Sequence, residues 1–110
     1  MVDQDSDFNG WSYRKRPLGG TETAFVLLAE SLSKLGHKVI ALTKSSKSIR
    51  YQGVYWKPLD TKIKECDIYI INRAPSLLDS APKCKKTILW LHNPANYLNK
   101  FRNFRRLFFK

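Results

Sequence analysis

The chain has 110 residues, enough for one small domain, and an apolar content of 43% that is ordinary for a globular protein. Its formal net charge is +11, with twelve Lys and Arg against four acids in residues 56–110. Such a charge attracts phosphates, nucleic acid or acidic lipid. The composition excludes a membrane-spanning helix, because no apolar run approaches ~20 residues, and the acidic, polar start does not resemble a secretory leader.

The start of the chain is expected to be a loop, because residues 3–20 are polar, contain glycines and lack any period. A doubly wound α/β domain begins with a strand that leads into its glycine loop. Only Met1 and Val2 precede the loop here. We therefore expect the first strand to be missing and the chain to be truncated at its front.

A helix is predicted over residues 23–35, where apolar side chains recur on one face: Phe25, Leu28, Leu32 and Leu35. Thr21 is the expected N-cap, and Gly36 is the expected residue just beyond the C-terminus. Glu22 is expected to favour the helix dipole from the first turn.

Four apolar or β-favouring runs are predicted to form strands: 39–43, 51–59, 67–71 and 87–91. Residues 75–81 are expected to form a short helix or turn, and residues 95–109 a final helix. Strands that are apolar on both faces and alternate with helices indicate a mostly parallel sheet with helices on both faces. The predicted fold is therefore α/β and Rossmann-like, a single partial domain over residues 1–110.

Two glycines, Gly19 and Gly20, open the first helix. Bare N–H groups at a helix N-terminus suit an anion, commonly a phosphate. The spacing matches neither the phosphate loop with its lysine nor the GxGxxG pattern. A plain turn that shortens the loop is the alternative.

Polar residues follow two of the predicted strands directly. Asn72 and Arg73 follow one strand, and His92 and Asn93 follow another. Ligands of open parallel sheets bind at the carboxyl ends of the strands, so we expect these residues to lie near the glycine turn at one edge. The alternatives are a solvated arginine and a structural histidine, although Pro94 marks a strand terminus and favours a site.

The two cysteines, Cys66 and Cys84, lack metal-ligand spacing. They are expected to be buried small hydrophobes in a reducing compartment, which favours a cytoplasmic location; a disulfide is the alternative. No metal and no cofactor is expected.

The predicted last helix carries an aromatic stripe with basic residues around it. It is expected either to pack its stripe on the sheet or to contact an acidic membrane surface on the inner face of the membrane through its basic side.

Two segments carry a resemblance to a known family. Residues 19–43 contain a Gly-Gly-x-Glu turn, a helix, a Gly-His turn and a Val-rich strand, and residues 88–94 read Ile-Leu-Trp-Leu-His-Asn-Pro. Together they resemble the N-terminal domain of family 4 glycosyltransferases of the GT-B type, over about residues 17–110. These are retaining enzymes that use a nucleotide-sugar donor.

The resemblance implies a role for each matching residue. Gly19 and Gly20 would bind the donor diphosphate, and His92 would be the active-site histidine facing the transferred sugar or the acceptor. Asn72, Arg73 and Asn93 are expected to line the cleft on the acceptor side. The partners implied are a nucleotide-sugar and a glycan or lipid-linked acceptor.

The chain supplies only one wall of a two-domain active site, so it is expected to be inactive alone. The alternative function, suggested by the net charge of +11, is a small basic nucleic-acid-binding module. The sequence contains no recognised nucleic-acid motif, and its aromatic residues have core-like spacing. Specific nucleic-acid binding is therefore not expected.

Overall fold

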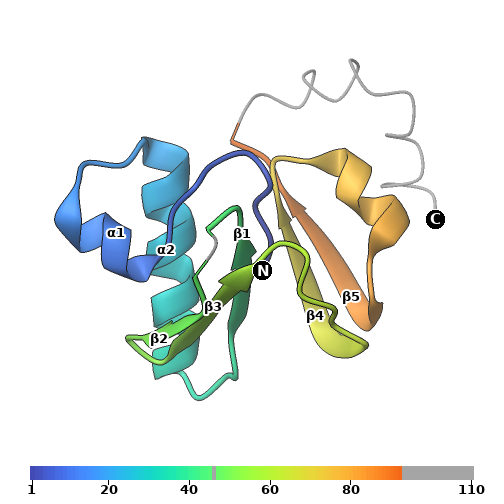
Figure 1. Cartoon of the computed structure of the whole chain (residues 1–110). Coiled ribbons are helices and arrows are strands. Elements are labelled where there is room, and N and C mark those ends of the chain that lie inside the picture. Colours follow the sequence, from blue (N-terminus) through green and yellow to red (C-terminus); the bar gives the residue numbers. More distant parts are fainter. Residues whose placement is uncertain (46, 93–110) are drawn as a thin grey trace. The chain divides into compact units, whose positions relative to one another are not determined.

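A computed structural model of the chain describes residues 1–45 and 47–92 (Figure 1). The chain divides into two compact units, Met1–Lys62 and Ile63–Lys110. The first contains two helices and a three-stranded mixed sheet, and the second contains a two-stranded parallel sheet and a short 3-10 helix. The expected α/β class is confirmed. Within the described ranges, no helix is both long enough and apolar enough to cross a membrane.

The sheet of the first unit has the strand order β1-β3-β2. β1 (Ile40–Thr43) runs parallel to β3 (Val54–Pro58), while β2 (Ile49–Tyr51) runs antiparallel to β3. The prediction of one strand over residues 51–59 is therefore wrong. Gln52 and Gly53 have φ values of 52° and 79°, as tight two-residue hairpin turns require, and this turn separates the two strands.

The first residues of the chain lie beside β1, where we expected the strand to be missing. Val2 forms a parallel bridge with Leu42. The Leu42 N–H donates to the Met1 carbonyl and the Asp3 N–H donates to the Leu42 carbonyl, each at 2.9 Å. Val2 and Asp3 are 2% and 0% exposed. A short bridged segment at the position of the expected strand thus leads into the segment that precedes the glycines.

That segment is not a plain loop, because it contains the helix α1 (Gly10–Lys15). Asn9 caps this helix reciprocally with Ser12. The Ser12 N–H donates to Asn9 Oδ1 at 2.9 Å, and the Asn9 N–H donates to Ser12 Oγ at 2.7 Å. Local capping hydrogen bonds therefore stabilise this helix. Its sequence has no apolar period from which the helix could have been predicted.

α2 (Gly20–Lys34) is the helix expected from the periodicity, with a different start. Its N-cap is Gly19, so the prediction of Thr21 is wrong. Glu22 lies at the third helical position, and its Oε2 accepts a hydrogen bond from the Gly19 N–H at 3.1 Å. Gly36, with φ of 100°, follows the C-cap as predicted.

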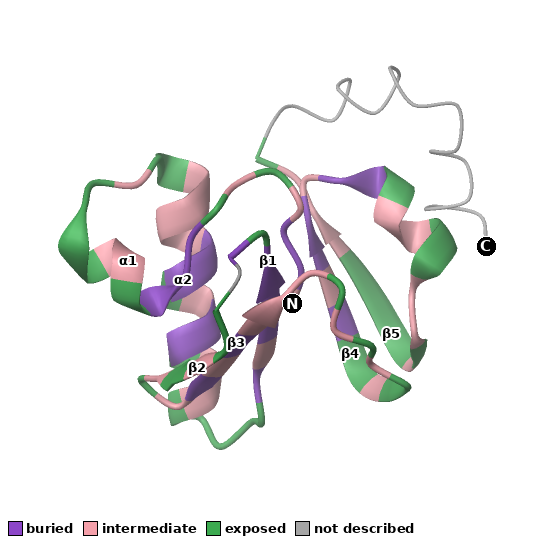
Figure 2. Ribbon diagram, in the orientation of Figure 1, coloured by how far each residue is buried: buried purple, intermediate pink, exposed green. Residues whose placement is uncertain are grey.

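The core of the first unit is built around three aromatic side chains in contact. Phe8, Phe25 and Trp56 have ring centroids 5.4–6.0 Å apart and are at most 1% exposed. Figure 2 shows the buried residues gathered on α2, β1 and β3. Arg14 of α1 also makes two 2.9 Å bonds to Glu30, a buried carboxylate on α2. These contacts attach α2 to the sheet and α1 to α2.

The second unit pairs β4 (Glu65–Asn72) with β5 (Lys83–Trp90) in parallel, joined through the 3-10 helix η1 (Pro75–Ser80). The two strands and the short helix expected here are confirmed, although β4 and β5 begin earlier than predicted. The helix predicted over 95–109 lies outside the described residues.

We predict that Gly53→Ala destabilises the chain more than Gly36→Ala. Both substitutions place a side chain at positive φ, which costs about 1–2 kcal/mol. Only a Cβ at Gly53 would also overlap a side chain, that of Ser33 on α2, whereas nothing lies within 4 Å of a Cβ at Gly36. Urea unfolding of the two variants measures the difference.

The double variant Ser33→Ala, Gly53→Ala is the matched control for the overlap. It should regain part of the stability that Gly53→Ala loses, because it removes the Ser33 hydroxyl that overlaps the new methyl group. Equal stability of the two single variants would contradict the proposed contact.

Candidate functional site

The ends of β4 and β5 bring together two of the predicted site residues. Asn72 ends β4 and lies opposite Trp90, which ends β5. His92 follows two residues later and is exposed, while Asn72 is 0% exposed. His92 Nε2 and Asn72 Oδ1 are 2.7 Å apart, a hydrogen bond. Residues twenty positions apart in the sequence thus meet at the carboxyl edge of this parallel pair.

The hydrogen bond fixes how the imidazole is presented. An amide oxygen only accepts hydrogen bonds, so the imidazole donates its Nε2–H to Asn72. In neutral His92, Nδ1 is then the acceptor nitrogen. The Trp90 and His92 rings also pack at 4.6 Å between centroids, tilted by 40°. A buried amide and an aromatic ring therefore hold an exposed imidazole in one orientation.

Arg73 adds an unusual backbone conformation to the same edge. Its φ is 54°, in the left-handed region that non-glycine residues seldom adopt. Its N–H donates to the Trp90 carbonyl at 3.0 Å, continuing the pairing of the two strands past Asn72. Left-handed residues of this kind concentrate at functional sites, and this one places a half-buried guanidinium residue beside Asn72.

The glycine turn belongs to the first unit. Gly19 and Gly20 are both exposed, and nothing lies within 4 Å of a Cβ built on Gly20. The helical hydrogen bonds begin with the Thr23 N–H and the Gly19 carbonyl at 3.0 Å, so the N–H groups of Gly20 and Thr21 precede the ladder, as anion-binding helix ends require. The Glu22 carboxylate, however, already accepts from Gly19.

The structure thus joins some of the predicted site residues and leaves others untested. Asn72, Arg73 and His92 lie together in one unit. A cleft shared with Gly19 and Gly20 stays a prediction, because those residues belong to the other unit. Asn93 lies outside the described residues. Asn72 and His92 were each predicted as site residues from their positions after a strand, but their hydrogen bond depends on the strand register and was not predicted.

Comparisons of the chain with protein-family models, with curated proteins and with solved structures found no match. In residues 1–45 and 47–92, no cluster of three or more His, Cys, Asp or Glu side chains is placed to hold a metal ion.

We predict that neutral His92 is the Nε2–H tautomer and that this preference depends on Asn72. Asn72→Leu substitutes an apolar side chain of similar size for the amide and removes the acceptor, so the tautomer preference should weaken. Long-range ¹H–¹⁵N correlation spectra of the imidazoles measure it. His37, exposed in the other unit, is the internal control; an Nδ1–H tautomer of His92 in the unaltered chain would contradict the assignment.

Proposed function

We propose that this chain is the acceptor-side, Rossmann-like wall of a family 4 glycosyltransferase of the GT-B type. The complete enzyme would move a sugar, with retention, from a nucleotide-sugar to a glycan or lipid-linked acceptor. The observation that carries the proposal is the 2.7 Å bond between His92 and Asn72 at the carboxyl end of two parallel strands. This is the position where such folds bind ligands.

His92 is proposed to position a sugar hydroxyl. Its exposed ring, held by Asn72 and Trp90, offers a fixed hydrogen-bonding direction. Holding a reactant in one orientation lowers the barrier by removing the entropy of alignment. Because Asn72 is fully buried, its proposed role is to orient His92, and direct acceptor contacts fall to Arg73 and His92.

The helix start at Gly19 and Gly20 is proposed to support the departing diphosphate. Backbone N–H groups at a helix N-terminus stabilise negative charge that develops in a transition state. Since the Glu22 carboxylate accepts from the Gly19 N–H, the diphosphate would have to displace Glu22 to use that donor. Gly20 and Thr21 would supply the remaining N–H groups.

A GT-B active site lies between two domains, so turnover requires a partner domain that would hold the nucleotide. We propose that the chain works as a cytoplasmic protein, with an acidic membrane surface as a further partner. The basic segment proposed for that contact lies outside the described residues.

We predict that His92→Ala lowers turnover at least ~100-fold, equivalent to roughly 2.7 kcal/mol of transition-state stabilisation. The measurement is release of nucleoside diphosphate from a panel of nucleotide-sugars, using the protein encoded by the complete open reading frame. His37→Ala is the matched control, because it removes the other histidine, which is exposed on the first unit.

Thermal melts of both variants separate catalysis from folding. His92 is exposed, so its replacement should change the melting temperature little. Unchanged turnover with a collapsed melting temperature would make His92 a structural residue. Absence of release from every nucleotide-sugar would count against the glycosyltransferase proposal as a whole.

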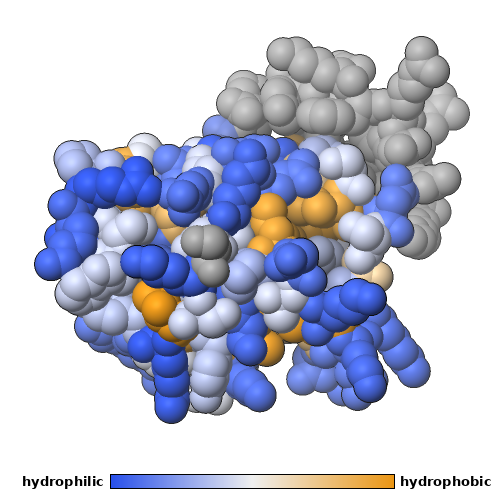
Figure 3. All heavy atoms as spheres, viewed as in Figure 1, coloured by the Kyte–Doolittle hydropathy of each residue, from blue (hydrophilic) through white to orange (hydrophobic). Residues whose placement is uncertain are grey.

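The second candidate function is nucleic-acid binding, favoured by the net charge of +11. Hydrophilic side chains cover most of the face seen in Figure 3, around smaller hydrophobic areas. Base stacking needs exposed rings, and Trp11 is 48% exposed. The three aromatic residues of the core, in contrast, are at most 1% exposed and cannot stack on bases: Phe8, Phe25 and Trp56.

We predict weak, sequence-independent binding to nucleic acid that is lost by ~0.2 M salt, because counterion release supplies nearly all of its free energy. Fluorescence anisotropy with labelled single- and double-stranded oligonucleotides across a salt series measures it. Trp11→Ala should leave the affinity nearly unchanged. Sequence-selective binding that persists above that salt concentration would favour the nucleic-acid function over the enzyme.

A further inference from the structure

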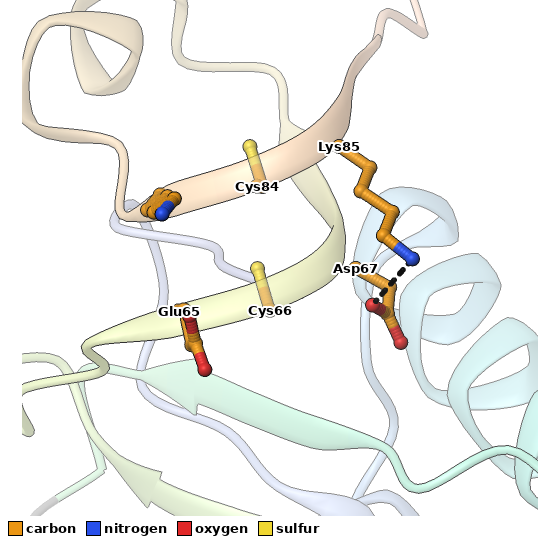
Figure 4. A pocket seen from close by; sticks show the side chains of 6 residues that line it. Glu65, Cys66, Asp67, Cys84 and Lys85 are labelled. Carbon is orange, nitrogen blue, oxygen red and sulfur yellow. Dashed lines mark ion pairs between the residues drawn. The ribbon is translucent and has the colours of Figure 1, made fainter.

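The amino ends of β4 and β5, opposite the edge that carries His92, place two cysteines side by side. Cys66 and Cys84 are each the second residue of their strand, and the parallel register pairs them directly. Both are free thiols and both are half-buried. Figure 4 shows their sulfur atoms projecting from the same side of the sheet. The strand register therefore brings two cysteines that are distant in the sequence next to each other as a pair of thiols.

The strand spacing suits a bond between them. Neighbouring strands lie about 4.8 Å apart, and the Cα atoms of disulfide-bonded cysteines are usually about 4.4–6.8 Å apart. Directly paired residues on one side of a sheet fall within this range. The Cα spacing of this pair therefore permits a disulfide.

Two further polar side chains belong to this cluster. Thr87 Oγ1 lies 3.1 Å from Cys84 Sγ, so the hydroxyl can donate to a Cys84 thiolate. Tyr69 pairs with Thr87 across the strands and is 8% exposed. Burial raises the pKa of the Tyr69 phenol, and the two neighbouring thiols raise it further. The phenol is thus a neutral neighbour of both sulfur atoms at neutral pH.

The two thiols differ in their surroundings. Burial raises the pKa of the Cys66 thiol, and the adjacent Cys84 adds to that increase. The Thr87 hydroxyl lies 3.1 Å from the sulfur of Cys84 and can stabilise a thiolate there, so we assign Cys84 as the attacking thiol.

A small molecule can reach this end of the sheet. An open pocket of about 460 Å³ is lined by both cysteines and by four charged residues: Glu65, Asp67, Lys83 and Lys85. This volume is in the range of small-molecule sites. Lys85 pairs with Asp67 at 3.7 Å at its rim, as the dashed line in Figure 4 marks.

We propose that Cys66 and Cys84 form a reversible redox pair that exchanges with low-molecular-weight disulfides. The Cys84 thiolate attacks one sulfur of the small disulfide, forming a mixed disulfide and releasing one thiol. Cys66 then loses its proton to solvent and attacks Cys84 Sγ, forming the Cys66–Cys84 bond and releasing the second thiol. The dithiol is oxidised by two electrons, and the small disulfide is reduced to two thiols.

The test uses the full chain and oxidised glutathione at neutral pH, followed by peptide mass mapping. The expected product is one intramolecular Cys66–Cys84 disulfide, whose mass is lower than that of the dithiol by two hydrogens. Reduced glutathione should convert this disulfide back to the dithiol. Stable glutathione adducts on both cysteines, or disulfide-linked dimers, would overturn the proposal. This measurement needs no variant, so it stands even where a substitution impairs folding.

Single-cysteine variants test the order of attack. Cys66→Ser should accumulate a glutathione adduct on Cys84, and Cys84→Ser should form its adduct on Cys66 more slowly. Equal or reversed rates would refute Cys84 as the nucleophile. Circular dichroism confirms that each variant keeps its secondary structure.

Thr87 offers a matched pair of substitutions. In the Cys66→Ser background, Thr87→Val should slow adduct formation about two- to threefold. One hydrogen bond changes the thiolate population by more than this, but the lower nucleophilicity of a stabilised thiolate offsets part of the change. Thr87→Ser keeps the hydroxyl and should restore the rate; equal rates for the Val and Ser variants would remove Thr87 from the mechanism.

Discussion

Parallel hydrogen bonding between β4 and β5 is the constraint on which the chemistry of the second unit depends. One register sets both ends of the pair: Asn72 opposite Trp90 at the carboxyl end, and Cys66 opposite Cys84 at the amino end. A slip by one residue would separate both pairs at once and turn the side chains to the other face. The proposed sugar site and the proposed redox pair therefore both depend on the same backbone pairing of β4 with β5.

Hydrophobic pattern was sufficient to predict one of the two α-helices and three of the strands. The helix over 23–35 was located from its apolar period, and the strands over 39–43, 67–71 and 87–91 from continuous apolar runs. Asn72 and His92 could be proposed as site residues because each follows such a strand, and parallel strands end at a common edge. The hydrogen bond between Asn72 and His92 could not be predicted, because it depends on the register of β4 and β5, which is a tertiary property.

The errors come from structure that leaves no apolar pattern. α1 depends on the reciprocal bonds between Asn9 and Ser12, and the β2–β3 hairpin depends on the positive φ of Gln52 and Gly53. Both are local hydrogen-bonding or steric features within polar sequence. The N-cap of α2 was misplaced for the same reason, because Gly19 has no side chain to mark it and Glu22 supplies the bond from the third helical position.

At the proposed diphosphate site, Glu22 would make the start of α2 selective. Its carboxylate is tethered to the helix it caps, so it competes with dissolved anions at a high effective concentration. A monovalent anion that displaced the Glu22 carboxylate would replace one negative charge by another, so its binding would gain little free energy. A diphosphate carries more charge and reaches several N–H groups at once, so it can outcompete the tethered carboxylate. The helix start would then discriminate among anions by their valence, with Glu22 setting the threshold.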